Sequence, residues 1–153
     1  DNRTDYIKRL IGMPGDTIQF IEGDIYLNEK KISRKKIKEN YKIRCGSLNL
    51  SVNAFQETLP NGKKLIAVYK KEGTMKNTDK YKVPNENYFF LGDNRDCSRD
   101  SRYLSSVGYV KKNNLVGKAK IIFFSNDTVS GSFLKIWNWK NSLRIKRFFK
   151  ILK

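Results

Sequence analysis

The chain has 153 residues, with 32 Lys and Arg against 15 Asp and Glu and a net charge of +17. This length suits one domain with its own core, and the charge favours anionic partners such as nucleic acid or an anionic lipid surface. No apolar run approaches the roughly 20 residues of a spanning helix, so we expect any anchoring or targeting segment to lie outside these residues. The absence of histidine excludes Ser-His-Asp and Cys-His catalysis, and a hydrolase would need carboxylates or an amine of lowered pKa.

Short alternating segments in the first half predict a mainly β chain. Residues 17–20 and 25–27 are expected to form strands around a turn, with apolar side chains on one face. Residues 28–53 are polar, basic and weakly periodic, which predicts a solvent-exposed excursion or ribbon. Residues 55–59 and 65–69 predict the clearest hairpin, because an Asn-Gly turn pair lies between them.

The second half predicts two more strands and one late helix. The strands are expected at residues 88–91 and 115–124. Near the end, four apolar residues follow helical spacing among basic neighbours: Ile145, Phe148, Phe149 and Leu152. With Trp137 and Trp139 just before it, such a basic amphipathic helix suits a membrane interface, although it could equally pack its stripe on the domain.

The basic residues and the two cysteines carry weaker signals. The basic residues gather in two clusters, and a solvated face is the preferred interpretation of each: Lys30, Lys31, Arg34, Lys35, Lys36, Lys38, Lys42 and Arg44; Lys135, Lys140, Arg144, Lys146, Arg147, Lys150 and Lys153. Cys45 and Cys97 lack the spacing of metal ligands, so we expect no metal. A disulfide between them is possible, but buried free thiols are the preferred interpretation.

Residues 5–16, DYIKRLIGMPGD, form the first segment with chemical potential. Lys8 lies among Tyr6, Ile7, Leu10 and Ile11, so part of its surroundings should be apolar. Loss of hydration lowers the pKa of an ammonium and makes a neutral amine available as a base. Taken alone the signal is moderate, since a lysine beside a buried strand usually keeps its head in solvent.

Residues 92–102, GDNRDCSRDSR, form the second segment and follow an apolar strand. Its interleaved aspartates and arginines predict a network of ion pairs and bonds to the backbone, rather than a simple soluble loop. Ser98 and Ser101 are small hydroxyls within it that could position a neighbouring amine.

In this order, the two segments resemble the two later sequence boxes of type I signal peptidases, the Ser–Lys endopeptidases that remove signal peptides from exported proteins. Residues 58–63, 115–119 and 147–149 also resemble family features. The resemblance therefore covers nearly the whole chain.

The resemblance implies a mainly β fold with the antiparallel catalytic core of signal peptidases and LexA-like repressors. Residues 1–27 and 82–153 would form this core, with residues 28–81 as an inserted ribbon and hairpin region. By the same resemblance Lys8 matches the general base, and Ser98 matches the hydroxyl that orients the lysine amine.

Two charged pairs are also carried over by the resemblance. Arg9 and Asp93 match an ion pair behind the site, and Asp100 and Arg102 match a second pair that shapes the loop. Cys97 departs from the family pattern, which usually has asparagine there, and residues 104–108 are longer than the usual aromatic-Gly-aromatic step.

The family's nucleophile lies in a Ser-Met-x-Pro segment upstream of the lysine, and no Ser-x-x-Pro occurs in this chain. We therefore expect these residues alone to be inactive, and the full protein to be anchored in a bacterial inner membrane with this part on the extracytoplasmic face. The implied partners are signal peptides of exported preproteins and an anionic membrane surface, with a monomer and neither a cofactor nor nucleic acid expected. Two alternatives stay open: a nucleic-acid-binding β domain, and a non-catalytic basic module of the membrane surface.

Overall fold

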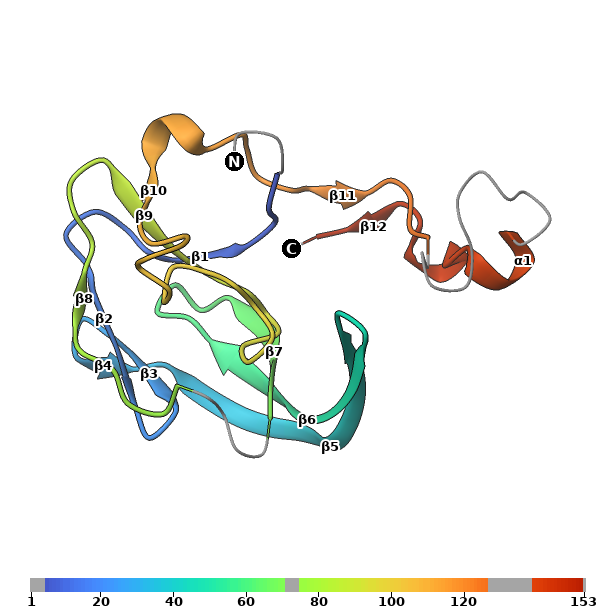
Figure 1. Cartoon of the computed structure of the whole chain (residues 1–153), viewed down its shortest axis with the longest axis horizontal. Helices are drawn as coiled ribbons and strands as arrows, with labels where there is room; N and C mark the ends of the chain where they lie inside the picture. The colour runs from blue at the N-terminus through green and yellow to red at the C-terminus, as the bar shows by residue number, and fades with distance from the viewer. Residues whose placement is uncertain (1–4, 71–74, 127–138, 153) are drawn as a thin grey trace. The chain divides into compact units, whose positions relative to one another are not determined.

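The computed structural model describes residues 5–70, 75–126 and 139–152, and its fold is mainly β (Figure 1). The chain divides into two compact units, Asp1–Leu115 and Val116–Lys153. The division of the chain into a core and an insertion at residues 28–81 stays a prediction.

Two small antiparallel sheets supply the main core of the first unit. The first has the order β1-β9-β10: Arg9–Gly12, Asn87–Leu91 and Val110–Lys111. The second has the order β4-β3-β2-β8: Lys30–Lys31, Asp24–Leu27, Thr17–Ile21 and Tyr81–Lys82. The strands predicted at residues 17–20, 25–27 and 88–91 are therefore confirmed.

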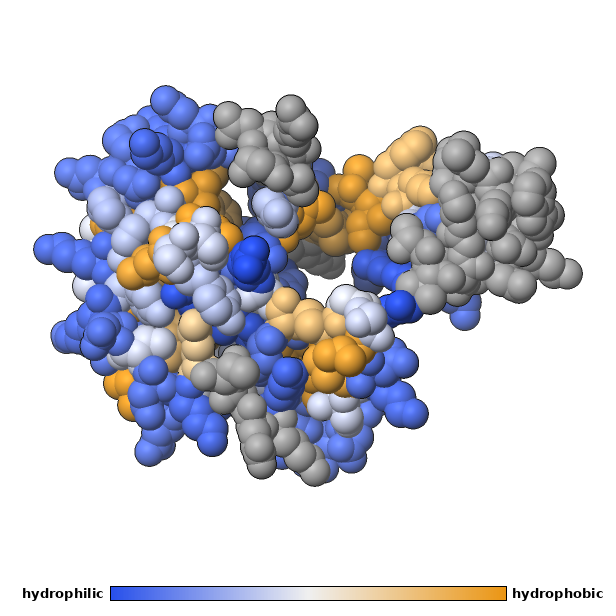
Figure 2. Space-filling view, viewed as in Figure 1, coloured by the Kyte–Doolittle hydropathy of each residue, from blue (hydrophilic) through white to orange (hydrophobic). Residues whose placement is uncertain are grey.

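Alternation along β2 and β9 explains how this core forms. Ile18 and Phe20 are buried on one face of β2, while Phe89 and Leu91 are buried on β9. Together with the buried Ile11 of β1 they belong to one apolar cluster. Hydrophilic side chains cover most of the visible face of this unit, and apolar ones gather there in small patches (Figure 2).

A third sheet is formed by the long hairpin of β5 (Ser33–Cys45) and β6 (Leu48–Thr58), followed by β7 (Lys64–Tyr69). The hairpin predicted around Asn61-Gly62 is confirmed, and Gly62 adopts a φ of 77° that favours glycine. The predicted ribbon at residues 28–53 is largely β5 and the start of β6. Pairing of β5 with β6 shifts register between Lys36 and Tyr41, and the hairpin bends towards its tip (Figure 1).

The second unit contains the elements β11 (Ile121–Ile122), α1 (Trp139–Ser142), η3 (Ile145–Arg147) and β12 (Lys150–Ile151). The strand predicted over residues 115–124 is thus limited to two residues. None of the helices in the described part of the chain is long and apolar enough to cross a membrane.

The predicted amphipathic helix at residues 145–152 is wrong. A single 3-10 turn ends at Arg147, Phe148 is extended, and Phe149 has a φ of 54°. β12 instead pairs with β11, and the Phe123–Phe149 and Phe124–Phe148 rings lie with centroids 5.4 and 5.1 Å apart. These distant aromatic partners favour strand pairing over local helical spacing. Trp137, Lys135 and Lys153 lie outside the described residues.

Candidate active site

Strand pairing brings the lysine segment and the charged loop together. β1 and β9 are antiparallel, with Arg9 opposite Leu91, so Lys8 just before β1 comes close to Gly92 just after β9. The loop after Gly92 then places Ser98 beside the lysine, and Lys8 Nζ donates a hydrogen bond of 2.7 Å to Ser98 Oγ. The two residues are 90 positions apart in the chain, so their contact depends on this pairing.

Lys8 is half-buried, although its apolar neighbours in sequence do not enclose it. Tyr6, Ile7 and Leu10 are exposed, and only Ile11 lies in the core. The described contacts of the lysine amine are the Ser98 hydroxyl and the face of the Tyr6 ring, whose centroid is 5.9 Å away. The expected apolar surroundings are therefore only partly present, because β1 alternates and sends one side chain inwards and the next outwards.

Gly92 is a site residue that sequence reasoning missed. A Cβ at this position would lie 2.1 Å from Ser98 Oγ, 2.3 Å from Ser98 Cβ and 3.6 Å from Lys8 Nζ. Ser98 therefore occupies the space that any larger side chain at residue 92 would need. The signal in the sequence was a glycine directly after an apolar strand, since such a glycine often marks a place where another group approaches the backbone closely.

The two charged pairs form as the resemblance implies. Arg9 Nε and Nη2 donate to Asp93 Oδ1 and Oδ2 at 2.7 and 2.9 Å, in a bidentate pair that stays largely in solvent. The hydrogen bond to Asp93 raises the pKa of the Arg9 guanidinium above its usual value. This pair links the first residue of β1 to the residue that follows Gly92.

The Asp100–Arg102 pair is buried and holds Gly92 in place. Arg102 Nε and Nη2 donate to the two Asp100 oxygens at 2.8 and 2.9 Å, and Asp100 Oδ2 also accepts from the Gly92 backbone N–H at 2.9 Å. Burial lowers the pKa of Arg102, but its bond to Asp100 outweighs this and the pKa lies above its usual value. Asp100 thus links Gly92, which lies under Ser98, to Arg102 at the end of the loop.

A second buried network was not predicted from the sequence. Arg95, whose side chain is fully buried, forms a bidentate pair with Glu57 of β6 at 2.9 and 2.6 Å. It also donates to the Tyr69 hydroxyl of β7 and to the Gly92 carbonyl. Burial raises the pKa of the Tyr69 phenol, which in turn donates to Glu57. Nothing in the local pattern of β6 or β7 marks these two residues as partners of a distant loop.

Cys45 and Cys97 form a disulfide, which corrects the preference for buried free thiols. Their Cα atoms are 5.8 Å apart, within the usual range for such a bond, and both residues are half-buried. Cys45 ends β5, which bends where its pairing with β6 shifts register, and Cys97 lies in a loop 52 residues further along the chain. A weakly periodic strand gives no sign of such a bend.

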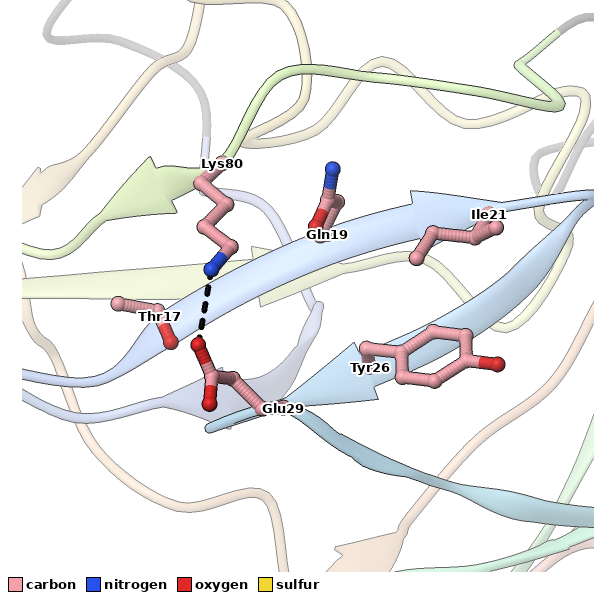
Figure 3. A pocket seen from close by; sticks show the side chains of 6 residues that line it. All are labelled: Thr17, Gln19, Ile21, Tyr26, Glu29 and Lys80. Atoms are coloured by element: carbon pink, nitrogen blue, oxygen red, sulfur yellow. Dashed lines mark hydrogen bonds and ion pairs between the residues drawn. The ribbon is translucent and has the colours of Figure 1, made fainter.

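A depression of about 250 Å³ lies elsewhere, on the outer face of β2 and β3. Figure 3 shows its side chains, including the ion pair of 2.9 Å between Lys80 Nζ and Glu29 Oε1. It is lined by Thr17, Gln19, Ile21, Tyr26, Glu29 and Lys80. None of these residues belongs to the lysine segment or to residues 92–102, so the depression is separate from the candidate site.

This chain is similar to proteins of one known family. Residues 1–124 match the family "Signal peptidase, peptidase S26". Signal peptidase I of Rickettsia typhi is 42% identical over 162 residues, which cover 96% of this chain and 59% of that protein. Signal peptidase I of Rickettsia akari is 41% identical over 167 residues, covering 99% and 60% respectively. A crystal structure of signal peptidase I from Enterococcus faecalis is 27% identical, with a TM-score of 0.38 over 73% of this chain and 80% of that one.

These matches identify the class as a hydrolase family of serine endopeptidases. The chain belongs to the signal peptidase family, peptidase S26. It spans 59% of the length of the Rickettsia typhi relative, so the activity of the whole protein is taken up as a proposal.

Proposed function

We propose that this chain is the catalytic part of a serine endopeptidase of the signal peptidase I type, which removes signal peptides from exported preproteins with a Ser–Lys dyad. The observation that carries the proposal is the contact of Lys8 with Ser98 above Gly92. It supports the roles that the resemblance assigns, because a lysine can act as a base only when its amine is held in a fixed direction.

Lys8 is the general base in this mechanism. A serine from a segment upstream of residue 8 attacks the carbonyl carbon of the scissile peptide, and the neutral amine of Lys8 accepts its proton. Lys8 then returns this proton to the leaving amine, so that an acyl-enzyme and a new N-terminus are formed. In the second half Lys8 takes a proton from water as the water oxygen attacks the ester carbonyl carbon. Lys8 then gives this proton to the departing serine oxygen, which frees the serine and releases the other product with a new carboxyl group.

Ser98 acts on the lysine rather than on the substrate. Its oxygen accepts from the amine at 2.7 Å, which leaves the nitrogen lone pair free to point towards the serine. Gly92 and Asp100 support Ser98 from below, since the Gly92 N–H is fixed by the Asp100 carboxylate. The Arg9–Asp93 ion pair links β1 to the residue after Gly92.

The substrate would bind by strand addition. In the described residues β1 pairs only with β9, so its other edge offers unpaired backbone groups directly after Lys8. Leu10 and Met13 are exposed along this segment and can contact an extended peptide. An extended signal-peptide end with small side chains before the cleaved bond would fit this edge.

The same proposal includes a location at a bacterial inner membrane, with this part on the extracytoplasmic face. The Cys45–Cys97 disulfide supports it, because such bonds persist in oxidising compartments. The C-terminal segment is not the predicted helix, yet it still combines Arg147 and Lys150 with the exposed Phe149 and Ile151. This combination supports contact with an anionic membrane surface.

The proposal is tested by cleavage of a preprotein with the full-length protein, including any residues that precede Asp1 in its gene. Lys8→Ala removes the base, and we expect cleavage to fall to background while the fold is kept, as measured by circular dichroism. Lys112→Ala, another surface lysine of the same unit, is the matched control and should cleave normally. Normal turnover by Lys8→Ala would reject the assignment of the base.

A second arm uses residues 1–153 alone. We expect this chain to fold and to cleave no preprotein, since it has no Ser-x-x-Pro segment. Cleavage by this chain that survives Lys8→Ala would point to a different catalytic centre.

A further inference from the structure

Ser98 lies next to a disulfide cysteine, in a short part of the loop that has few described hydrogen bonds. Among the described residues, Cys97 has the disulfide and a bond of 3.3 Å from its N–H to the Asn94 carbonyl. The described partner of Ser98 is the Lys8 amine. Ser98 is buried against Gly92, and the disulfide at Cys97 is the one described covalent cross-link that restrains residues 97–99.

The flanking parts of the loop are fixed far more densely. Before this stretch, Arg95 is held by Glu57, Tyr69 and its backbone bond to Val68. After it, Asp100 and Arg102 form the buried pair that also holds Gly92. The disulfide thus restrains the one stretch between two rigid anchors.

The other end of the disulfide is well supported. Cys45 pairs with Leu48 at the tip of the β5–β6 hairpin. A few residues further along, Ile43 and Leu50 pack against a cluster that includes the buried Val52 and Val68. The disulfide therefore attaches Cys97, the residue beside Ser98, to a packed β-sheet.

We propose that the Cys45–Cys97 disulfide is a positioning element of the active site: it holds Ser98 over Gly92 and thereby fixes the direction of the Lys8 amine. This inference rests on the proposed function for its effect on catalysis, but not for its effect on Ser98. The Cβ and Oγ of Ser98 lie so close to the Gly92 backbone that a Cβ at residue 92 would overlap them. A free loop at residues 97–99 would let Ser98 rotate or lift away, and the lysine amine would lose its acceptor.

The first test is reversible reduction of the full-length protein. Dithiothreitol supplies two electrons and two protons, so that Cys45 and Cys97 become thiols while the reagent closes to its cyclic disulfide. We expect kcat for preprotein cleavage to fall at least tenfold and KM to stay within twofold, because Ser98 acts on the base and not on the substrate. Reoxidation should restore kcat.

The double variant Cys45→Ser/Cys97→Ser is the matched control. It should have the lowered kcat from the outset and should not respond to dithiothreitol. An unreduced kcat in this variant, or an equal loss of activity in the variant and the parent protein on adding the reagent, would overturn the proposal.

The second test does not depend on activity. In NMR relaxation of residues 1–153, we expect the amide order parameters of Cys97, Ser98 and Arg99 to fall on reduction, while those of Gly92 and Arg102 stay unchanged. Unchanged order parameters at residues 97–99 would overturn the proposal. An oxidised full-length protein that cleaves no preprotein would instead reject the proposed function, and this relaxation measurement would then decide alone whether the disulfide positions Ser98.

Discussion

Two charged segments of the first unit, the loop at residues 92–102 and the strand β5, differ in where their charge lies. The loop has three acidic and three basic side chains, and Arg95, Asp100 and Arg102 are buried in ion pairs. β5 has six basic side chains and one acidic one, and most of these basic groups face solvent. In the loop, acidic and basic side chains pair with one another and can therefore be buried. On β5 the basic side chains lack enough acidic partners and stay in solvent, and the strand is held by its backbone pairing with β6.

The comparison predicts its largest effect for Arg95. Arg95→Ala would leave the buried Glu57 carboxylate without its bidentate partner and would remove the support of the Gly92 carbonyl. We expect the free energy of unfolding to fall by about 3–5 kcal/mol, measured by urea denaturation.

Lys42→Ala on β5 is the matched control for this measurement. Its side chain is exposed, so the change should stay within about 0.5 kcal/mol. Similar losses for the two variants would mean that burial of charge is not what separates the two segments.

A second prediction concerns Gly92, where the loop approaches the lysine most closely. Gly92→Ala adds a Cβ that would overlap Ser98, so Ser98 must move away from Lys8. We expect kcat of the full-length protein to fall about 100-fold or more, since displacement of a positioned group by an ångström costs that much. Gly117→Ala, at an exposed position with open space around the Cβ, is the control for a general glycine effect and should keep its kcat. Equal kcat values for the two variants would contradict the described packing at residue 92.

The smallest predicted effect concerns Tyr69 and is seen in the pH dependence of stability. Burial raises the pKa of Tyr69 above its usual value of 10.0, so the fold holds the neutral phenol. Its contribution is therefore complete below about pH 10 and is lost as the pH rises above that value. Tyr69→Phe should cost about 1–2 kcal/mol at pH 7, because the hydroxyl bonds to Glu57 and Arg95 are lost.

The same variant should also flatten the decline in stability above pH 10, measured by thermal unfolding from pH 7 to 11. Tyr81 and Tyr109 have pKa values raised by burial as well, so part of the decline should remain. An unchanged slope would contradict a raised pKa for Tyr69 in the folded protein, since the pH dependence comes from the difference in pKa between the folded and unfolded states.

Features that depend on residues close together in the chain could be predicted from the sequence, and features that depend on residues far apart in the chain could not. The hairpin at Asn61-Gly62 and the strand β9 depend on local patterns and were predicted. The contact of Lys8 with Ser98 was implied by the resemblance of two segments to a known family, and no local pattern predicts it. Arg95 was visible in the sequence, but its partners Glu57 and Tyr69 come from strands whose pairing no local rule gives.

The incorrect predictions have the same cause. The disulfide joins the end of β5 to a loop 52 residues away, and the C-terminal strand brings Phe123 and Phe124 against rings some 25 residues away. Ile145, Phe148, Phe149 and Leu152 do follow helical spacing, but pairing with β11 gives this segment a strand instead of a helix.

The central claim is that the Lys8 amine is the proton acceptor, and it is tested most directly by removing and then restoring that amine. Lys8→Cys in the full-length protein should cleave no preprotein, because a thiol in this position does not replace the base. S-aminoethylation of the introduced thiol then places an amine at nearly the same reach as lysine, and we expect a measurable part of the activity to return. Activity of Lys8→Cys before treatment, or none after complete modification, would contradict the account.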